Sequence, residues 1–216
     1  ADGSEVAVKV RRPGIRPLVE ADLRLLQRLA RILESESPDL RRYQPQALVR
    51  QLQASLSREL DLAAECRHAE RIAASLADEP ALVVPRVYWD HTCERMNVQE
   101  FIDGIPLGDT DALLAAGADL PGLARVGARA GMRMMFEDGF FHADPHPGNV
   151  IRLPGDKLAL LDFGMVGRLS EARRHQVLDL FDGLVRRDAG QVAEVLLEWA
   201  ADEQVDEAAL QEEVDA

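Results

Sequence analysis

The feature that most limits how this 216-residue chain can fold is the run FHADPHPGNVIRLPGDKLALLDFG, residues 141–164. Pro145 and Pro147 exclude a regular helix or strand in its first part, because proline lacks an amide donor and restricts the residue before it. The apolar residues that follow indicate two short strands, 150–153 and 157–162, joined around Pro-Gly-Asp. The run therefore predicts an irregular loop followed by a β-hairpin, with acidic side chains at both ends.

The loop first suggests a metal site, because His142, Asp144 and His146 alternate as in the loops of metal-dependent hydrolases. The two prolines work against aiming these side chains at one ion, and no further His or Cys lies close by, so we disfavour zinc. We also set aside a serine nucleophile, since no serine occupies a glycine-flanked elbow beside a base.

A phosphate-handling site uses more of these residues. Asp144 and Asn149 lie five apart in the loop, and Asp162 ends an apolar strand. Phosphoryl transfer needs one carboxylate near the attacking hydroxyl, and an amide and a second carboxylate that hold magnesium on the phosphates. It also needs a cation for the nucleotide. Lys9, one of only two lysines, lies in the apolar strand VAVKV and fits that role, whereas we expect Lys157 to be a solvated surface residue.

Composition narrows the class of protein. A content of 47% hydrophobic and 29% charged residues is ordinary for a soluble domain, and no apolar run reaches the roughly 18 residues of a membrane span. The net charge of −13 argues against a nucleic-acid partner. Cys66 and Cys93 lie in unrelated segments, which favours a reducing cytoplasm. Without an initial Met or a signal peptide, the sequence is expected to be a cytoplasmic piece of a longer protein.

The order of predicted elements is strand, helices, strands and helices. Residues 6–10 predict a short strand with both faces largely covered. Apolar residues at helical spacing, mostly leucines, predict one helix after Pro17 and a second from about 46 to 77. Alternating and apolar stretches predict strands within 81–90 and 95–104.

Helices are expected again beyond Gly104, at 111–116 and from 121 to about 137. Two more begin near Ser170 and Asp188, each with a capping residue in place. We expect the acidic end, residues 201–216, to fray.

Four stretches, VAVKV, RELDLAAE, FHADPHPGNV and LLDFG, occur in this order, and together they resemble the UbiB family of atypical kinases over residues 6–187. HADPHPGN is highly specific, whereas DFG alone is a common triplet. The resemblance implies an α+β, protein-kinase-like two-lobed fold with a truncated N-lobe and extra helices inserted after the lysine strand. It implies a partial N-lobe at 1–104 with two long helices, and a C-lobe at 105–216 with the catalytic loop and DFG.

The resemblance also implies roles for individual residues. Lys9 would contact the nucleotide phosphates, with Glu65 as its ion-pair partner. Asp144 takes the place of the catalytic-loop aspartate, while Asn149 and Asp162 look like ligands of magnesium. The cofactors implied are ATP and Mg²⁺.

Two further acidic residues, Glu59 and Asp61, match the family's Glu-x-Asp signature, which helps to hold an N-terminal extension over the site. Asp61 and Glu65 are four apart, so we expect them to share one helix face and to repel each other unless a cation compensates. The alternative is that all three are solvated residues of a charged helix.

Other positions of the resemblance keep two interpretations each. Glu100, Phe101 and Ile102 fall where the two kinase lobes join, so their backbone is implied to bind adenine, and an ordinary buried strand is the alternative. His142 resembles the histidine before the catalytic aspartate, whose usual work is structural. His146 either replaces a positive residue near the transferred phosphate or is a solvated loop histidine.

The chain departs from the family pattern before its lysine strand. The two strands and the nucleotide-covering loop that normally precede it, and the family's Lys-x-Gly-Gln segment, are missing from the sequence. After DFG there is no room for a long activation segment and no Ala-Pro-Glu, where protein substrates usually dock. This favours a small-molecule or lipid phosphotransferase, or an ATPase, over an ordinary protein kinase.

The expected function is that of an ATP- and magnesium-dependent atypical kinase or ATPase of the UbiB type, supporting quinone or lipid metabolism. Its partners would be a nucleotide and a small-molecule or lipid substrate, and membrane association is expected of the full-length protein alone. One alternative is a phosphotransferase of the aminoglycoside or choline kinase type, which shares the His-x-Asp-x-x-Pro-x-Asn loop. The other is a pseudokinase scaffold, against which the intact set of site residues counts.

Overall fold

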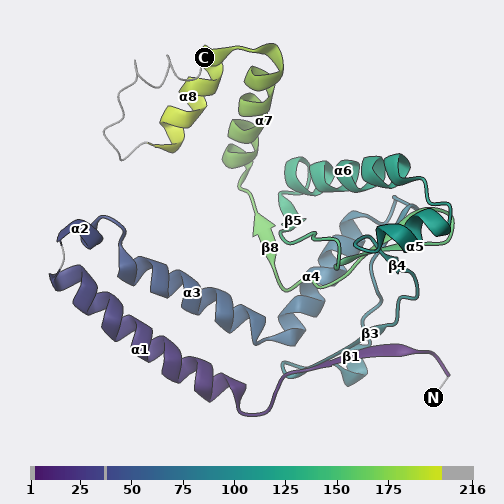
Figure 1. The fold of residues 1–216 in the computed structure, drawn as a ribbon, viewed down its shortest axis with the longest axis horizontal. Coiled ribbons are helices and arrows are strands. Elements are labelled where there is room, and N and C mark those ends of the chain that lie inside the picture. Colours follow the sequence, from purple (N-terminus) through teal and green to yellow (C-terminus); the bar gives the residue numbers. More distant parts are fainter. Residues whose placement is uncertain (1–2, 37, 201–216) are drawn as a thin grey trace. The chain divides into compact units, whose positions relative to one another are not determined.

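The computed structural model describes residues 3–36 and 38–200, which form helices and short strands in alternating groups (Figure 1). The strands are β1 (Val6–Val10), β2 (Leu82–Val83), β3 (Met96–Glu100), β4 (Ile105–Pro106), β5 (Phe140–His142), β6 (Val150–Leu153), β7 (Lys157–Leu160) and β8 (Val166–Arg168). The helices are α1 (Ile15–Glu36), α2 (Pro38–Arg41), α3 (Pro45–Glu59), α4 (Leu62–Ser75), the 3₁₀ turn η1 (Trp89–His91), α5 (Thr110–Ala115), α6 (Leu120–Phe136), α7 (Glu171–Arg186) and α8 (Ala189–Trp199).

The chain divides into two compact units. Among the described residues, the first contains 3–36, 38–128 and 142–166, and the second contains 129–141 and 167–200. Every candidate site residue lies in the first unit, so the candidate site belongs to one unit. The division into lobes at residue 104 stays a prediction.

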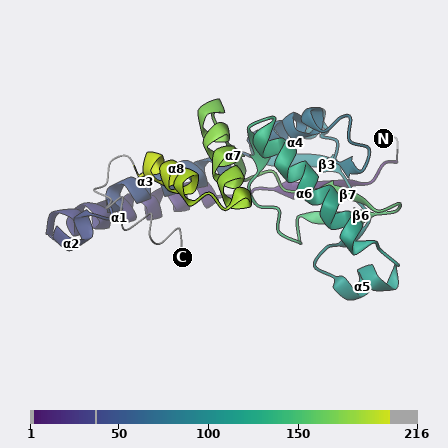
Figure 2. The same ribbon diagram turned by 90° about the horizontal axis from the view of Figure 1, so that it is seen from above.

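Two small sheets organise the first unit. Strand β1 pairs antiparallel with β3, and the register sets Lys9 opposite Asn97. The other sheet has the strand order β2-β7-β6-β4, with β2 parallel to β7. Strands β6 and β7 form the predicted hairpin, in whose turn Gly155 and Asp156 adopt left-handed backbone angles and Asp156 accepts hydrogen bonds from Arg152. Figure 2 shows these two strands from above.

The strand at 6–10 is present, but its expected coverage is wrong. Val8 is 54% exposed and Val10 63% exposed. In the part of the chain that the structure describes, β1 pairs only with β3. A run of β-branched residues predicts extended backbone, but it does not tell whether another strand covers it. Segment 81–90 is a strand only at β2, because Pro85 interrupts the pattern before η1.

The single helix predicted over 46–77 is two helices. Helix α3 ends at Glu59, and α4 begins at Leu62 after an extended Asp61 with φ −105° and ψ 90°. Oδ1 of Asp61 accepts the Ala64 N–H at 3.1 Å, so Asp61 is the N-cap of α4. Aspartate competes with helix continuation through this local bond. The expectation that Asp61 and Glu65 share one helix face is therefore wrong.

Helices α1 and α3 pack side by side, as both views show (Figures 1 and 2). The helix expected after Pro17 is present as α1, but only Leu23 and Ala30 are buried in it. Several of its apolar side chains are exposed, among them Leu25 and Ile32.

No helix among the described residues combines the length and the apolarity that crossing a bilayer requires.

The second unit contains a helix pair, α7 and α8, that starts as the sequence predicts. Ser170 caps α7 through the Arg173 N–H, and Asp188 caps α8 through the Gln191 N–H. Arg174 donates to the carbonyls of residues 136 and 137 at the end of α6. The expected fraying of residues 201–216 lies outside the described residues.

Candidate active site

Lys9 and Glu65 form an ion pair that joins β1 to α4. The Lys9 ammonium lies 3.1 Å from Oε1 and 3.0 Å from Oε2 of Glu65, so it donates to both carboxylate oxygens. The Glu65 side chain is 8% exposed and that of Lys9 is 49% exposed. The pair therefore has one buried member and one member that reaches solvent.

Local structure explains why the two side chains meet. The Leu62 N–H donates to the Glu94 carbonyl at 3.0 Å, which fixes the first turn of α4 beside the start of β3. Glu65 follows three residues later, within the first turn of that helix, where a negative charge is favoured. Because β1 is the antiparallel neighbour of β3, the same attachment brings Lys9 within reach.

The charges of the pair respond differently to their surroundings. Partial burial acts to lower the pKa of Lys9, but the carboxylates of Glu65 and Asp162 outweigh it and raise that pKa. Burial raises the pKa of Glu65 more than the Lys9 charge lowers it. The two shifts do not mirror each other because Glu65 is the more deeply buried partner. The protein thus keeps a fully charged lysine beside a carboxylate whose ionised form depends on that lysine.

Asp162 brings a second carboxylate to the same lysine. Its Oδ2 lies 3.4 Å from the Lys9 ammonium, and its Oδ1 accepts the Gly164 N–H at 3.2 Å. The backbone of Asp162 is left-handed, with φ 55°, a conformation that non-glycine residues seldom adopt. Lys9 therefore lies between a buried carboxylate on α4 and an exposed one after β7.

His142 connects the loop of Asp144 to the strand that leads to Asp162. Its Nδ1 accepts the Asp144 N–H at 3.2 Å, and its Nε2 lies 3.0 Å from the Leu161 carbonyl. Since a carbonyl only accepts, the proton is on Nε2 and the ring is neutral. Burial lowers the pKa of His142, which agrees with a neutral ring. The histidine is used structurally, as the sequence resemblance implied.

Asn149 closes the loop on itself. Its Nδ2 donates to the Asp144 carbonyl at 3.2 Å, and its own carbonyl accepts the Leu161 N–H at 2.8 Å. The side-chain oxygen of Asn149 then remains as the atom that an amide offers to a hard cation. Asp144 keeps its carboxylate half-exposed on the same loop.

The donor set of Asn149 and Asp162, one amide oxygen and one carboxylate, suits magnesium. Mg²⁺ is bound through one or two carboxylates and the substrate's phosphates, and it retains waters. Zinc needs more nitrogen or sulfur ligands than this loop provides, because both ring nitrogens of His142 are already engaged. Among the described residues, no group of three or more His, Cys, Asp and Glu side chains is arranged for a metal.

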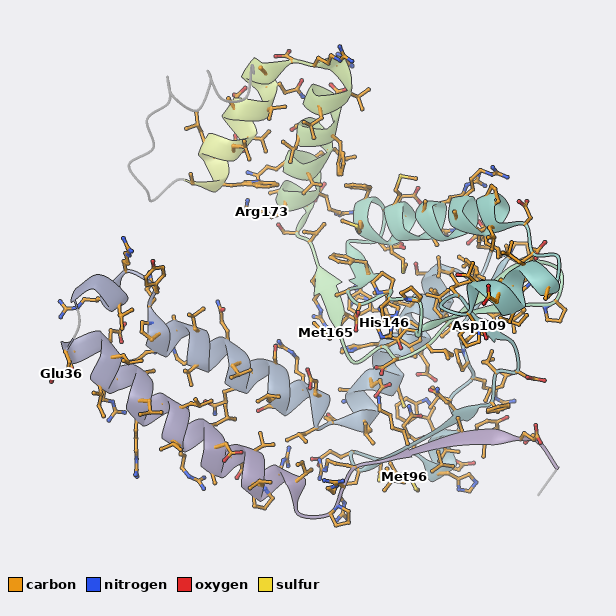
Figure 3. The ribbon with its side chains drawn as sticks, viewed as in Figure 1. Glu36, Met96, Asp109, His146, Met165 and Arg173 are labelled. Carbon is orange, nitrogen blue, oxygen red and sulfur yellow. The ribbon has the colours of Figure 1, made fainter. Side chains whose placement is uncertain are left out.

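His146 lies at the exposed tip of the loop. Its Nδ1 accepts the Gly148 N–H at 3.0 Å, and its Nε2 lies 3.9 Å from Oδ2 of Asp144. Figure 3 labels His146 and Met165, which mark the loop and the segment after Asp162; the Ala143 N–H donates to the Met165 carbonyl at 3.0 Å. Both expected roles of His146 stay predictions.

The signature residues Glu59 and Asp61 lie on either side of the break between α3 and α4. Glu59 is exposed at the end of α3, whereas Asp61 caps α4 and has its Oδ2 3.2 Å from Arg67. Glu65 alone of the three acidic residues contacts Lys9. The three are therefore not one set of equivalent solvated carboxylates.

The segment predicted to bind adenine leaves β3 at its last residue. Glu100 exchanges hydrogen bonds with Arg86: its N–H donates to the Arg86 carbonyl at 2.8 Å, and its Oε2 accepts the Arg86 N–H at 3.2 Å. Phe101 is 50% exposed and Ile102 is partly buried. The alternative of an ordinary buried strand is wrong for Glu100 and Phe101. Adenine binding there stays a prediction.

Sequence reasoning did not single out two polar residues near the pair. His68 lies on α4 three residues after Glu65, and its Nδ1 is 3.1 Å from the Phe163 carbonyl. Asn97, opposite Lys9, is only 1% exposed, and its Oδ1 has no partner among the described residues. The helical spacing from Glu65 was a signal for His68, since residues three apart share a face.

Comparison with known proteins places this chain in a family. A family model described as the ABC1 atypical kinase-like domain matches residues 1–196. The chain belongs to this family. It is 39% identical over 198 residues to the probable protein kinase UbiB of Klebsiella pneumoniae, and 39% identical over 197 residues to that of Pectobacterium carotovorum. These alignments cover 90% and 89% of the chain.

A solved structure supports the fold. The Mycobacterium tuberculosis protein Rv3197, determined as a complex with erythromycin, resembles 99% of this chain with a TM-score of 0.70 and 25% identity. The predicted α+β, kinase-like fold is thus confirmed, as is the UbiB resemblance. The chain spans 36% of the length of the two UbiB relatives and 54% of Rv3197.

Proposed function

We propose that this protein is an ATP- and magnesium-dependent phosphotransferase or ATPase of the UbiB type, acting in quinone or lipid metabolism. The observation that carries the proposal is the position of Lys9 between the buried Glu65 and the exposed Asp162. A kinase-type site uses such a lysine for the nucleotide phosphates, its glutamate to hold it, and the aspartate for the metal.

In this proposal each side chain has one task. Lys9 binds phosphate oxygens, and Glu65 orients its ammonium. Asn149 and Asp162 hold Mg²⁺, which supplies neutralisation of the phosphate charge when it is bound. Asp144 orients the attacking hydroxyl or water and accepts its proton.

Two other groups of residues have supporting roles in this proposal. The backbone of Glu100 and Ile102 binds the adenine. The signature pair Glu59 and Asp61 holds an N-terminal extension of the longer protein over the site.

The short connection after Asp162 bears on the substrate. Helix α7 begins at Glu171, and β8 occupies part of the interval, so little chain remains for docking a protein substrate. We therefore propose a small-molecule or lipid acceptor, or water. A cytoplasmic location, and membrane association only of the full-length protein, belong to the same proposal. No nucleic-acid partner is part of it.

The likeness to Rv3197 supplies a second ligand class to test. That protein was solved as a complex with erythromycin. A macrolide is therefore a reasonable competitor probe in the binding experiments on this protein.

The experiment that tests the proposal separates Asp144 from Asp162. Asp162→Asn should weaken magnesium-dependent nucleotide binding by about tenfold or more, since a charged ligand of the metal is lost. Asp144→Asn should keep nucleotide affinity within a few fold and lose about 10²- to 10⁴-fold in turnover. Calorimetry with and without Mg²⁺, beside a phosphate-release assay, measures both.

The matched control is Asp179→Asn on α7, an exposed carboxylate in the second unit. It should change neither quantity. If Asp144→Asn abolished binding while Asp162→Asn left it intact, the two roles would be reversed and the kinase assignment of this loop would be wrong.

A further inference from the structure

His68 links α4 to the segment of Asp162. Its Nδ1 lies 3.1 Å from the carbonyl of Phe163, a residue 95 positions later in the chain. Because that oxygen only accepts, the proton is on Nδ1 and the imidazole donates. The bond starts one turn of helix after Glu65, which holds Lys9. One helix thus carries both the lysine's partner and a donor to the aspartate segment.

The two carbonyls that flank Asp162 are both held by histidines. Leu161 on one side accepts from Nε2 of His142, and Phe163 on the other accepts from Nδ1 of His68. The Phe163 ring is buried and lies 5.2 Å from the His142 ring. Residues 161–163 are therefore held by hydrogen bonds from two elements, the strand before the Asp144 loop and the helix α4.

These backbone hydrogen bonds add to the contacts of the Asp162 carboxylate itself, which include the Gly164 N–H at 3.2 Å and the Lys9 ammonium. Its carboxylate is 48% exposed, and its contact with Lys9 is long at 3.4 Å. Its φ of 55° also costs free energy for a residue with a Cβ, so the surrounding structure has to over-determine that conformation. Hydrogen bonds to the two adjacent carbonyls do this without occupying the carboxylate.

We propose that His68 is a positioning residue that couples the placement of Glu65 on α4 to the orientation of Asp162. This inference rests on the proposed function and deepens it. The lysine pair and the metal-binding carboxylate are assembled together, because displacement of α4 also removes the donor to Phe163. His68 touches neither the nucleotide nor the metal in this role.

The first test measures the coupling without any ligand. His68→Phe keeps a ring of similar size and removes the donor, while His68→Asn returns an N–H at about the position of Nδ1. Hydrogen exchange of the amides of residues 161–165 should become about five- to tenfold faster in His68→Phe and return close to wild type in His68→Asn. If the phenylalanine variant does not fold, His68→Leu replaces it.

The matched control is His175 on α7, whose Nδ1 also bonds a backbone carbonyl, that of Glu171 in its own helix at 2.9 Å. His175→Phe should leave exchange at 161–165 unchanged. Unchanged exchange at 161–165 in the His68 variants, or an equal increase in His68→Asn, would overturn the proposal.

The second test uses catalysis. His68→Phe should lower turnover about five- to tenfold and raise the Mg²⁺ concentration needed for half-maximal rate, with nucleotide affinity measured without Mg²⁺ within about twofold. His68→Asn should recover most of the rate. A loss of metal-free affinity as large as the loss of rate would overturn positioning of Asp162. Absence of nucleotide binding by the wild type would instead refute the proposed function, while the exchange result would still decide the coupling.

Discussion

At the scale of single residues, the ion pair of Lys9 and Glu65 is asymmetric. Glu65 is buried, and Lys9 is half-exposed. Removing a lysine from such a pair leaves a carboxylate without its compensating charge in a place where water cannot replace it. Removing the glutamate leaves a lysine whose charge solvent and the Asp162 carboxylate can still stabilise. The two single substitutions should therefore differ in how they affect stability.

Lys9→Met should destabilise the protein in a pH-dependent way. Burial already holds the pKa of Glu65 above its unfolded value, and without Lys9 that pKa rises further. Ionised Glu65 then opposes folding, so stability is lost as pH rises from about 4.3 through the folded pKa. The loss in free energy of unfolding relative to the wild type should be small near pH 5 and reach about 1–2 kcal/mol at pH 8. This range allows for solvent screening of the pair, because Lys9 is half-exposed.

Urea unfolding of Lys9→Met across that pH range measures the effect. The control is Lys157→Met, which replaces the other lysine of the chain, an exposed residue of the β6–β7 hairpin. Its stability should follow the wild type at every pH. A Lys9→Met deficit that is constant with pH, or largest at pH 5, would contradict the role given to Glu65.

At the scale of elements, α4 is the part on which the site depends. Asp61 starts the helix, Glu65 binds Lys9 from its first turn, and His68 reaches Phe163 from the next. The position of this helix along the chain sets all three contacts. Its start is therefore the place where a local change should have distant effects.

Asp61→Ala should remove the N-cap and lower the free energy of unfolding by about 1 kcal/mol, because the Ala64 N–H loses its acceptor. Asp61→Asn keeps an acceptor oxygen, so it should lower the free energy of unfolding by only about a few tenths of a kcal/mol. Chemical denaturation compares them with Glu59→Ala, the other signature residue, which is exposed at the end of α3. Equal losses for Asp61→Ala and Glu59→Ala would show that the cap is not what Asp61 contributes.

The sequence predicts the features that local signals determine better than those that depend on distant neighbours. Capping and spacing rules predicted α7 and α8 from Ser170 and Asp188, because those signals are local. The break at Asp61 was missed, since the apolar spacing continues across it from Leu60 to Ala63 and Ile72. The exposure of Val8 was missed, and the strand was wrongly expected to be covered, because burial depends on neighbours that the strand's own residues do not specify.

The site divides in the same way. The motifs of the loop and of β1 are enough to single out Lys9, Asp144 and Asp162, because each motif is a run of adjacent residues. His68 and Asn97 belong to no such motif. Their importance comes from what lies across from them, the Phe163 carbonyl and Lys9, and such pairings arise only when distant segments fold together.

At the scale of the whole molecule, charge is unevenly distributed. The net charge is −13, yet residues 15–59 contain eight arginines against six carboxylates. The acidic excess therefore belongs to the rest of the chain, which includes the site. A nucleotide is a polyanion, so the field it meets at a distance is repulsive.

Association of ATP should consequently become faster as salt is raised from about 20 to 200 mM, because screening weakens repulsion between like charges. This is the reverse of the usual behaviour of proteins that bind polyanions. Stopped-flow measurement with a fluorescent nucleotide tests it, and Mg²⁺ should reduce the salt effect by lowering the ligand's charge. Slower association in higher salt would show that Lys9 and its neighbours dominate the field.

The left-handed backbone of Asp162 has a consequence for protein engineering. Glycine adopts that conformation without steric cost, whereas aspartate loses on the order of 1 kcal/mol there. A library of variants selected only for resistance to heat would thus be drawn toward glycine at this position and would discard the proposed metal ligand. Selection for thermal tolerance and selection for catalysis would therefore favour different residues at position 162. A consensus sequence built from the heat-selected variants would lack the proposed metal ligand.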